Sequence, residues 1–223
     1  MNTTNRLHIR NLSFSYSDKE ILKNITIDIE SGRLTSIQGR NGTGKSTLLK
    51  CIAGLSKPTQ GEISLNNISL QSLTPLERSR QLAALWTDRL RIAGFTIYDL
   101  VLMGTYNAQK ESNSHELDSI VTSCLSALGI EHLSQRSLDQ VSDGELQKAM
   151  IARALAQQPA FLLLDEPTTY LDYVAKEELM LTLQKLSSLK GIGIVFTSHE
   201  LELIRTYAHT RLEIADATIS QLK

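Results

Sequence analysis

The stretch LTSIQGRNGTGKSTLLKCIAG, residues 34–54, sets the fold, because a short β-type run passes directly into a helical one. Leu34–Gln38 has the apolar and β-branched composition of a strand, and it ends at Gly39. A helix is expected over residues 45–53, and Gly54 closes it. Glycines in the connecting turn let the backbone bend tightly, so that consecutive N–H groups point inward. The sequence therefore predicts a strand, a tight turn and a helix in immediate succession.

The turn reads GRNGTGKS, residues 39–46, and matches the phosphate-binding pattern G-x-x-x-x-G-K-[ST]. Backbone N–H groups and a helix N-terminus favour phosphate oxygens. Lys45 would place a point charge on the β- and γ-phosphates, and the Ser46 hydroxyl would be a ligand of Mg²⁺. A glycine-rich turn without a ligand is the alternative, and the flanking strand and helix argue against it. The expected nucleotide contacts are Gly39, Arg40, Asn41, Gly42, Thr43, Gly44, Lys45, Ser46 and Thr47.

A second chemical motif follows Phe161–Leu164, which has the pattern of a buried strand and ends in Asp165 and Glu166. Open α/β sheets place ligands at the carboxyl ends of their strands. Asp165 is expected to hold Mg²⁺, directly or through water, and Glu166 to polarise the water that attacks the γ-phosphate. His199 follows another predicted strand and is expected near the same γ-phosphate and water. Tyr16 is a candidate stacking partner for adenine. Taken singly, these residues also fit a solvated strand end, a structural histidine and an aromatic edge.

The remaining patterns alternate between β and α, except over residues 88–157, which are helical in pattern and carry 6 Lys/Arg against 9 Asp/Glu. We expect an α/β core of mostly parallel sheet over 1–87 and 158–223, with an antiparallel N-terminal β part and an inserted helical subdomain over 88–157. Because βαβ crossovers are right-handed, helices should cover both faces of the sheet. Further strands are expected over 7–14, 25–29, 62–65, 82–86 and 192–197, helices over 174–189 and 200–207, and a final hairpin from 212–214 and 218–222.

Bulk composition describes an ordinary globular chain of 223 residues with a formal net charge of -1. The small net charge gives no general attraction to nucleic acid or to an anionic membrane. Cys51 and Cys124 lie on predicted helices without metal-type spacing, which indicates buried residues in a reducing compartment. The N-terminus lacks the apolar segment of a signal peptide, and no apolar run approaches the ~20 residues of a membrane span. We therefore expect a cytoplasmic protein that reaches a membrane only by docking to another protein.

A third pattern, SDGELQKAMIARALAQ, starts as a capping box, in which Ser142 and Glu145 each satisfy a free backbone N–H of the other. This helix start lies 23 residues before Asp165. The motifs occur in an order that resembles the ATP-binding cassette (ABC) family over nearly the whole chain. They are Tyr16, GRNGTGKS, the helical insert, VSDGE at 141–145, the run ending in Asp165-Glu166-Pro167, Thr169–Asp172 and His199.

This resemblance implies a P-loop NTPase core and an ATPase that works as a head-to-tail pair of copies. Val141–Glu145 stands at the family's signature motif, which caps the ATP held by the opposite copy. Ser142 and Gly144 would then contact the partner's nucleotide, and Asp172 would lie on the loop that connects the two sites. ATP would hold this symmetric homodimer closed and hydrolysis would release it. That motion would drive a membrane permease, with the chain bound peripherally on the inner face of the cell membrane.

Within the family, DEPTTYLD at 165–172 and PLERSRQLAAL at 75–85 look most like importers of ferric siderophores, haem or cobalamin, which also use a substrate-binding protein. An exporter subunit is the nearer alternative. The single cassette and acidic insert disfavour a soluble ABC protein that acts on ribosomes, so no nucleic acid is expected as a partner. A weakly active module that binds ATP without turnover is a third reading. No added C-terminal regulatory domain is expected.

Three positions depart from the family pattern. Asp143 replaces a glycine and Glu145 a glutamine, and a carboxylate ~4 Å from a phosphate charge costs on the order of 1–4 kcal/mol. This cost is tolerable if Asp143 points away from the ligand and caps the helix, and the alternative is that Asp143 slows closure of the dimer, so Asp143 is not counted among the expected ligands. Thr87 stands at the place of a glutamine that senses Mg²⁺ and links the core to the permease-docking subdomain. Because its hydroxyl would reach the cation only through a water, we hypothesise that coupling to the permease is altered.

Overall fold

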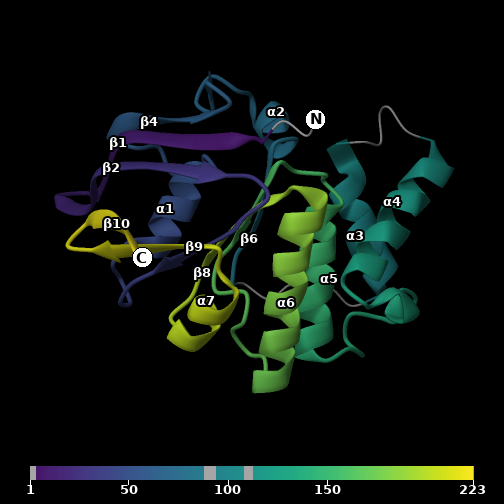
Figure 1. The fold of residues 1–223 in the computed structure, drawn as a ribbon. Helices are drawn as coiled ribbons and strands as arrows, with labels where there is room; N and C mark the ends of the chain where they lie inside the picture. Colours follow the sequence, from purple (N-terminus) through teal and green to yellow (C-terminus); the bar gives the residue numbers. More distant parts are fainter. Residues whose placement is uncertain (1–3, 88–93, 108–112, 223) are drawn as a thin grey trace.

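The computed structural model describes residues 4–87, 94–107 and 113–222, which form two β-sheets with helices around them (Figure 1). The larger sheet has the strand order β10-β9-β3-β8-β7-β6, and its pairs are parallel except for β9 with β10. The predicted mostly parallel core is therefore confirmed. Its strands are β3 (Leu34–Gln38), β6 (Leu82–Leu85), β7 (Phe161–Leu164), β8 (Gly193–Thr197), β9 (Thr210–Ala215) and β10 (Thr218–Leu222).

The N-terminal part forms a separate antiparallel sheet in the order β2-β1-β4-β5. Its strands are β1 (Arg6–Tyr16), β2 (Lys19–Glu30), β4 (Gln60–Leu65) and β5 (Ile68–Ser69). Side chains of β1 alternate between one buried face and one more exposed face, as expected for a sheet with one side toward the core. The antiparallel N-terminal β part predicted from the sequence is confirmed, and β5 is an addition to it.

The helices are α1 (Lys45–Ile52), α2 (Pro75–Ser79), α3 (Ile97–Gly104), α4 (Ser114–Ala127), α5 (Asp143–Leu155), α6 (Tyr173–Lys190) and α7 (Leu201–Tyr207), with 3-10 turns η1 (Thr105–Asn107) and η2 (Glu131–Leu133). Most predicted ends shift by one or two residues; the strand expected over 82–86, for example, ends at Leu85. Helix α2 was not predicted, although Pro75 and the Thr74–Glu77 capping box mark its start.

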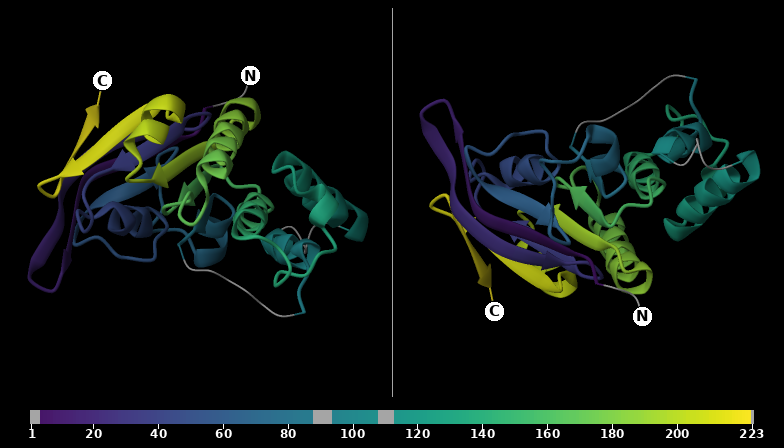
Figure 2. Two further views of the ribbon diagram at one scale, coloured as in Figure 1. Left: turned by 90° about the horizontal axis from the view of Figure 1, so that it is seen from below. Right: turned by 90° about the horizontal axis from the view of Figure 1, so that it is seen from above.

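Helix α1 lies between the two sheets, so the glycine-rich turn that precedes it is anchored on both sides (Figures 1 and 2). Its Leu48, Leu49 and Ile52 are fully buried in one cluster with apolar side chains of the antiparallel sheet and of β3, β7 and β8. A helix held in this way has little freedom to tilt, because protein interiors pack close to crystal density. The end of the helix that would face the phosphates is therefore fixed in place.

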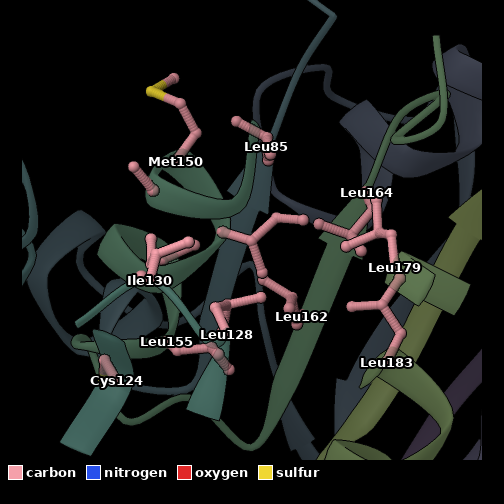
Figure 3. Close-up of a cluster of buried hydrophobic side chains, with 14 of the residues drawn as sticks. Leu85, Cys124, Leu128, Ile130, Met150, Leu155, Leu162, Leu164, Leu179 and Leu183 are labelled. Carbon is pink, nitrogen blue, oxygen red and sulfur yellow. The ribbon is translucent and has the colours of Figure 1, made fainter. Parts of the chain in front are cut away.

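The opposite face of the larger sheet is covered by α5, α6 and α7, so helices do cover both faces as predicted. Figure 3 shows Leu162 and Leu164 of β7 between side chains of α5 and α6. Helices α3 and α4 pack onto α5, away from the antiparallel sheet (Figure 2). The subdomain limits at 87/88 and 157/158 stay a prediction, and the first of them adjoins residues outside the described ranges.

Candidate functional site

The loop between β3 and α1 has the backbone shape that its glycines predict. Gly39, Gly42 and Gly44 all have positive φ values, of 151°, 78° and 104°. A Cβ at Gly39 would lie 2.6 Å from the carbonyl oxygen of Ile214, and one at Gly44 would lie 2.9 Å from Ile21. A larger residue at either position would collide with these neighbours, so glycine at both ends of the loop allows its backbone to lie close to β2 and β9.

Lys45 lies inside this loop rather than on its surface. The side chain is only 6% exposed, and its Nζ donates to the carbonyl oxygens of Gly39 at 3.0 Å and Arg40 at 3.2 Å. Gly44 occupies the N-cap of α1 and gives no side-chain cap, and the first turn of α1 contains no acidic residue. The loop therefore combines a held ammonium group with helix N–H groups that no side chain caps, which suits a phosphate.

The carboxyl ends of β3, β7 and β8 bring the predicted acidic residues to this loop. The Ser46 hydroxyl donates to Asp165 Oδ1 at 2.9 Å, across 119 positions of sequence. Glu166 follows at a left-handed φ of 50°, and its Oε2 lies 3.0 Å from His199 Nδ1. The site thus brings together Lys45, Ser46, Asp165, Glu166 and His199 as the sequence predicts.

Chemically, this arrangement can accept a proton and bind a divalent cation. Glu166 is a carboxylate within hydrogen-bond reach of an imidazole, the geometry of an oriented general base. Ser46 and Asp165 supply two oxygen ligands of the hard type that Mg²⁺ prefers, and Mg²⁺ commonly takes its other ligands from phosphates and water. No group of three or more His, Cys, Asp or Glu side chains within the described ranges could hold a metal ion without such help. The residues present therefore fit a nucleotide-bound Mg²⁺.

Four further residues belong to this site and were not predicted. Thr197 contacts both Asp165 and Glu166. The other three form a brace beside it: Glu200 accepts from the Thr168 hydroxyl at 2.8 Å and from Lys176 Nζ at 2.9 Å. A polar residue two positions before His199, at the end of an apolar strand, was the available signal for Thr197. The Glu200 contacts depend on tertiary packing and left no local pattern in the sequence.

Thr87 also lies at the site, but its hydroxyl donates to a backbone group. Its Oγ1 is 3.3 Å from the carbonyl oxygen of Asp165. Tyr16 is at the end of β1, 51% exposed, with its ring in edge contact with Phe14 at a centroid distance of 4.7 Å. An exposed ring supported from behind is available for stacking, so adenine binding by Tyr16 stays a prediction.

The predicted partner-facing residues lie together at the start of α5. Ser142 is the N-cap, and its N–H and hydroxyl donate to Glu145 Oε2 at 2.7 and 2.8 Å, so the predicted capping box is confirmed. A Cβ at Gly144 would meet only Leu171, at 3.4 Å. Asp172 caps α6 by accepting from the N–H of Ala175 at 2.8 Å. Contacts of these residues with a second copy stay a prediction.

The capping box predicts a pH-dependent contribution to stability. Hydrogen bonds from the Ser142 N–H and hydroxyl lower the pKa of Glu145 below its ordinary value near 4.5. A lowered pKa in the folded state means that the carboxylate stabilises the fold above about pH 4.5 and that this contribution is lost as the pH falls through the folded value. We expect Glu145→Gln, which keeps the acceptor oxygen but loses the charge, to unfold more easily than wild type at pH 7.

The difference in unfolding free energy between wild type and Glu145→Gln should shrink below about pH 4.5, as measured by denaturant titration at several pH values. Glu62→Gln controls for the loss of one charge elsewhere, because Glu62 is exposed on β4. A difference that stayed constant from pH 7 to pH 3 would show that the charge of Glu145 does not contribute.

The fold and site together define a P-loop nucleotide triphosphatase. The central parallel strand β3 runs through GRNGTGKS into a helix, and β7, which lies on the other side of β8 in the same sheet, ends directly before Asp165 and Glu166. The chain belongs to the ABC transporter family, whose family model matches residues 22–169. It is therefore an ABC-type ATPase. No helix within the described ranges is long and apolar enough to cross a membrane.

Several known proteins are similar to this chain over most of its length. The petrobactin import ATP-binding protein FpuD of Bacillus anthracis is 36% identical over 96% of this chain and 79% of its own length. The ferric enterobactin transport ATP-binding protein FepC of Escherichia coli K12 is 33% identical over 96% of this chain and 80% of its own length. The dimeric structure of MJ0796, a bacterial ABC transporter cassette, superimposes with a TM-score of 0.83, 27% identity and coverage of 97% of this chain and 99% of that one.

Proposed function

We propose that this chain is the ATPase subunit of an ABC importer, and that ATP hydrolysis drives uptake of an iron chelate, haem or cobalamin through a membrane permease. The observation that carries the proposal is the gathering of Lys45, Asp165, Glu166 and His199 at one sheet edge. It occurs in a chain similar to two proteins named for petrobactin import and for ferric enterobactin transport. We also propose a cytoplasmic location on the inner face of the membrane and a substrate-binding protein as an indirect partner.

At the site, the loop over residues 39–47 would hold the phosphates of ATP, with Lys45 on the β- and γ-phosphates. Ser46 and Asp165 would hold Mg²⁺, which supplies charge neutralisation to the phosphates. Glu166 would take a proton from the attacking water, and His199 orients its carboxylate from 3.0 Å. Correct placement of these groups, rather than covalent chemistry, would account for most of the rate.

The second half of the site would come from another copy of the chain. In a head-to-tail pair, Ser142 and Gly144 of one copy would face the γ-phosphate bound by the other. The N-terminus of α5 carries partial positive charge that favours an anion. Asp172, which caps α6 beside Leu171, would connect the two sites. The position of Leu171 supports this link, because its side chain lies 3.4 Å from where a Cβ at Gly144 would be, which places the residue before Asp172 beside the start of α5.

Transport in vesicles that contain the chain, its permease and the substrate-binding protein tests the proposed function. We expect ATP hydrolysis to rise when the binding protein is loaded with a ferric siderophore, and labelled cargo to move toward the side that carries the ATPase. Haem and cobalamin are compared in the same vesicles. Cargo that moved away from the ATPase side would identify an exporter. A rate of ATP hydrolysis that did not change with any of the three cargoes would contradict the import proposal.

Thr87 gives a test of coupling within this function. We expect Thr87→Gln to change the ratio of permease-stimulated to basal hydrolysis several-fold, because the longer amide can reach past the Asp165 carbonyl that Thr87 now contacts. The affinity for ATP should stay within about 2-fold. Thr206→Gln on α7 makes the same replacement at an exposed position outside the site. If both the basal and the stimulated rates were unchanged in Thr87→Gln, the coupling hypothesis would be dropped.

A further inference from the structure

Thr197 is the last residue of β8 and is completely buried, with 0% of its surface exposed. Its Oγ1 is 2.7 Å from Asp165 Oδ1 and 2.9 Å from the backbone nitrogen of Glu166. A hydroxyl has one hydrogen to donate. Since the Glu166 N–H can only donate, the Thr197 hydroxyl accepts there and donates to the Asp165 carboxylate. One side chain thus connects the two acidic residues of the site.

We propose that Thr197 is a positioning residue for ATP hydrolysis, whose hydroxyl fixes the Asp165 carboxylate and the Glu166 backbone as one unit. This inference rests on the proposed roles of Asp165 and Glu166. Asp165 would hold a cation and Glu166 would accept a proton, and both roles would depend on the same Thr197 hydroxyl, which donates to Asp165 and accepts from the Glu166 N–H.

The first consequence concerns the carboxylate of Asp165. Thr197 and Ser46 both donate to Oδ1, at 2.7 and 2.9 Å, and no described residue donates to Oδ2. Two donors on one oxygen fix the plane of the carboxylate and leave the other oxygen available to a cation. The Thr197 hydrogen bond comes from a fully buried strand residue, so it holds the carboxylate independently of how the Ser46 hydroxyl is engaged.

The second consequence concerns the backbone of Glu166. Its φ of 50° lies in the left-handed region, which costs an L-residue free energy and persists only when neighbouring groups hold it. The hydrogen bond from the Glu166 N–H to Thr197 is one such hold. This backbone conformation directs the side chain to His199, whose Nδ1 lies 3.0 Å from Oε2. Without the Thr197 hydroxyl, the left-handed backbone of Glu166 would lose this support, and the Glu166 carboxylate would no longer be held toward His199.

Replacement by valine separates this role from simple packing at the end of β8. Valine has nearly the shape of threonine but lacks the hydroxyl, so Thr197→Val leaves the Glu166 N–H without its acceptor and Asp165 Oδ1 with Ser46 as its one remaining donor. Thr197→Ser keeps the hydroxyl and loses only a methyl group. Thr35→Val on β3 is the matched control, because Thr35 is almost as buried, at 1% exposed, on the neighbouring strand.

The test compares purified wild type and these variants by two readouts. The first is the kcat and KM of ATP hydrolysis. The second is Mn²⁺ binding to each protein with a non-hydrolysable ATP analogue, followed by electron paramagnetic resonance. For Thr197→Val we expect kcat to fall 10-fold or more with KM within about 3-fold, and Mn²⁺ binding to weaken about 10-fold, as for a lost hydrogen bond to a charged group. Thr197→Ser and Thr35→Val should stay within about 3-fold of wild type.

A folded Thr197→Val protein with wild-type kcat and Mn²⁺ affinity would overturn the proposal, and so would a Thr197→Ser protein that lost as much as the valine variant. If the valine variant does not fold, Thr197→Ala replaces it with the same expected losses. A wild-type protein that bound Mn²⁺ and the analogue but hydrolysed no ATP would contradict the proposed function instead. The Mn²⁺ readout would still decide the role of Thr197 in that case.

Discussion

Replacing Glu166 by glutamine is expected to lower kcat for ATP hydrolysis by roughly 10²- to 10⁴-fold, the usual contribution of a general base. Glutamine has the same shape, so the left-handed backbone at φ 50° and the contact with His199 can persist. An amide does not accept a proton from water at neutral pH. ATP should therefore still bind, with KM within a few-fold, while turnover stops. Steady-state hydrolysis and equilibrium ATP binding measure the two effects separately.

Glu202→Gln is the matched control, because Glu202 is an exposed carboxylate on α7 and its loss changes the net charge by the same amount. It should retain the wild-type kcat. If Glu166→Gln hydrolysed ATP within 10-fold of wild type, another group would have to accept the proton. A loss of ATP binding in step with kcat would instead assign Glu166 to the nucleotide pocket.

Gly144→Asp is expected to prevent ATP-driven dimerisation while leaving ATP binding to the single chain unchanged. A Cβ at Gly144 meets only Leu171 at 3.4 Å, so the fold accepts the side chain. An acidic residue in the first turn of a helix also favours the helix. In a head-to-tail pair, however, the new carboxylate would approach the partner's phosphates, at about 1–4 kcal/mol for each site. With two sites in each pair, the dimer should weaken at least about 30-fold.

Ser114→Asp provides the comparison for this variant, because it adds the same charge to the first turn of α4, at an exposed position. Light scattering in ATP and Mg²⁺ measures the dimer, and binding of a fluorescent ATP analogue at low protein concentration measures the single chain. Unchanged dimerisation of Gly144→Asp would place the start of α5 away from the partner's nucleotide. Weakened binding in the monomer would place it at the nucleotide of its own chain.

The phosphate loop and its flanking elements could be predicted because their signals are local. The strand limits Leu34–Gln38 and Phe161–Leu164 agree with the structure residue for residue, and the capping box at Ser142 has the predicted partners. Each of these features depends on the order of residue types over a few positions. Glycine at 39 and 44 is likewise favoured by local backbone geometry, since both residues have a positive φ.

Features that depend on strand pairing could not be predicted from the same patterns. Thr197 reaches Asp165 and Glu166 because β8 pairs with β7 in the register that places Leu164 opposite Phe196. A change of one residue in this register would turn the hydroxyl to the other face of the sheet. The Glu200 brace requires the approach of α6 to the end of β8, which no local pattern records. Helix α2 was missed for a different reason, since its capping box was present but its five residues are too few for a clear period.

Measurement of the molecular mass of Glu166→Gln in ATP and Mg²⁺, with and without Gly144→Asp in the same chain, tests the central claim most directly. The claim is that two copies close over ATP, each completing the other's site through the N-terminus of α5. The account predicts a stable dimer for the single variant and a monomer that still binds ATP for the double variant. A single variant that stayed monomeric with ATP bound, or a double variant that dimerised equally well, would contradict it.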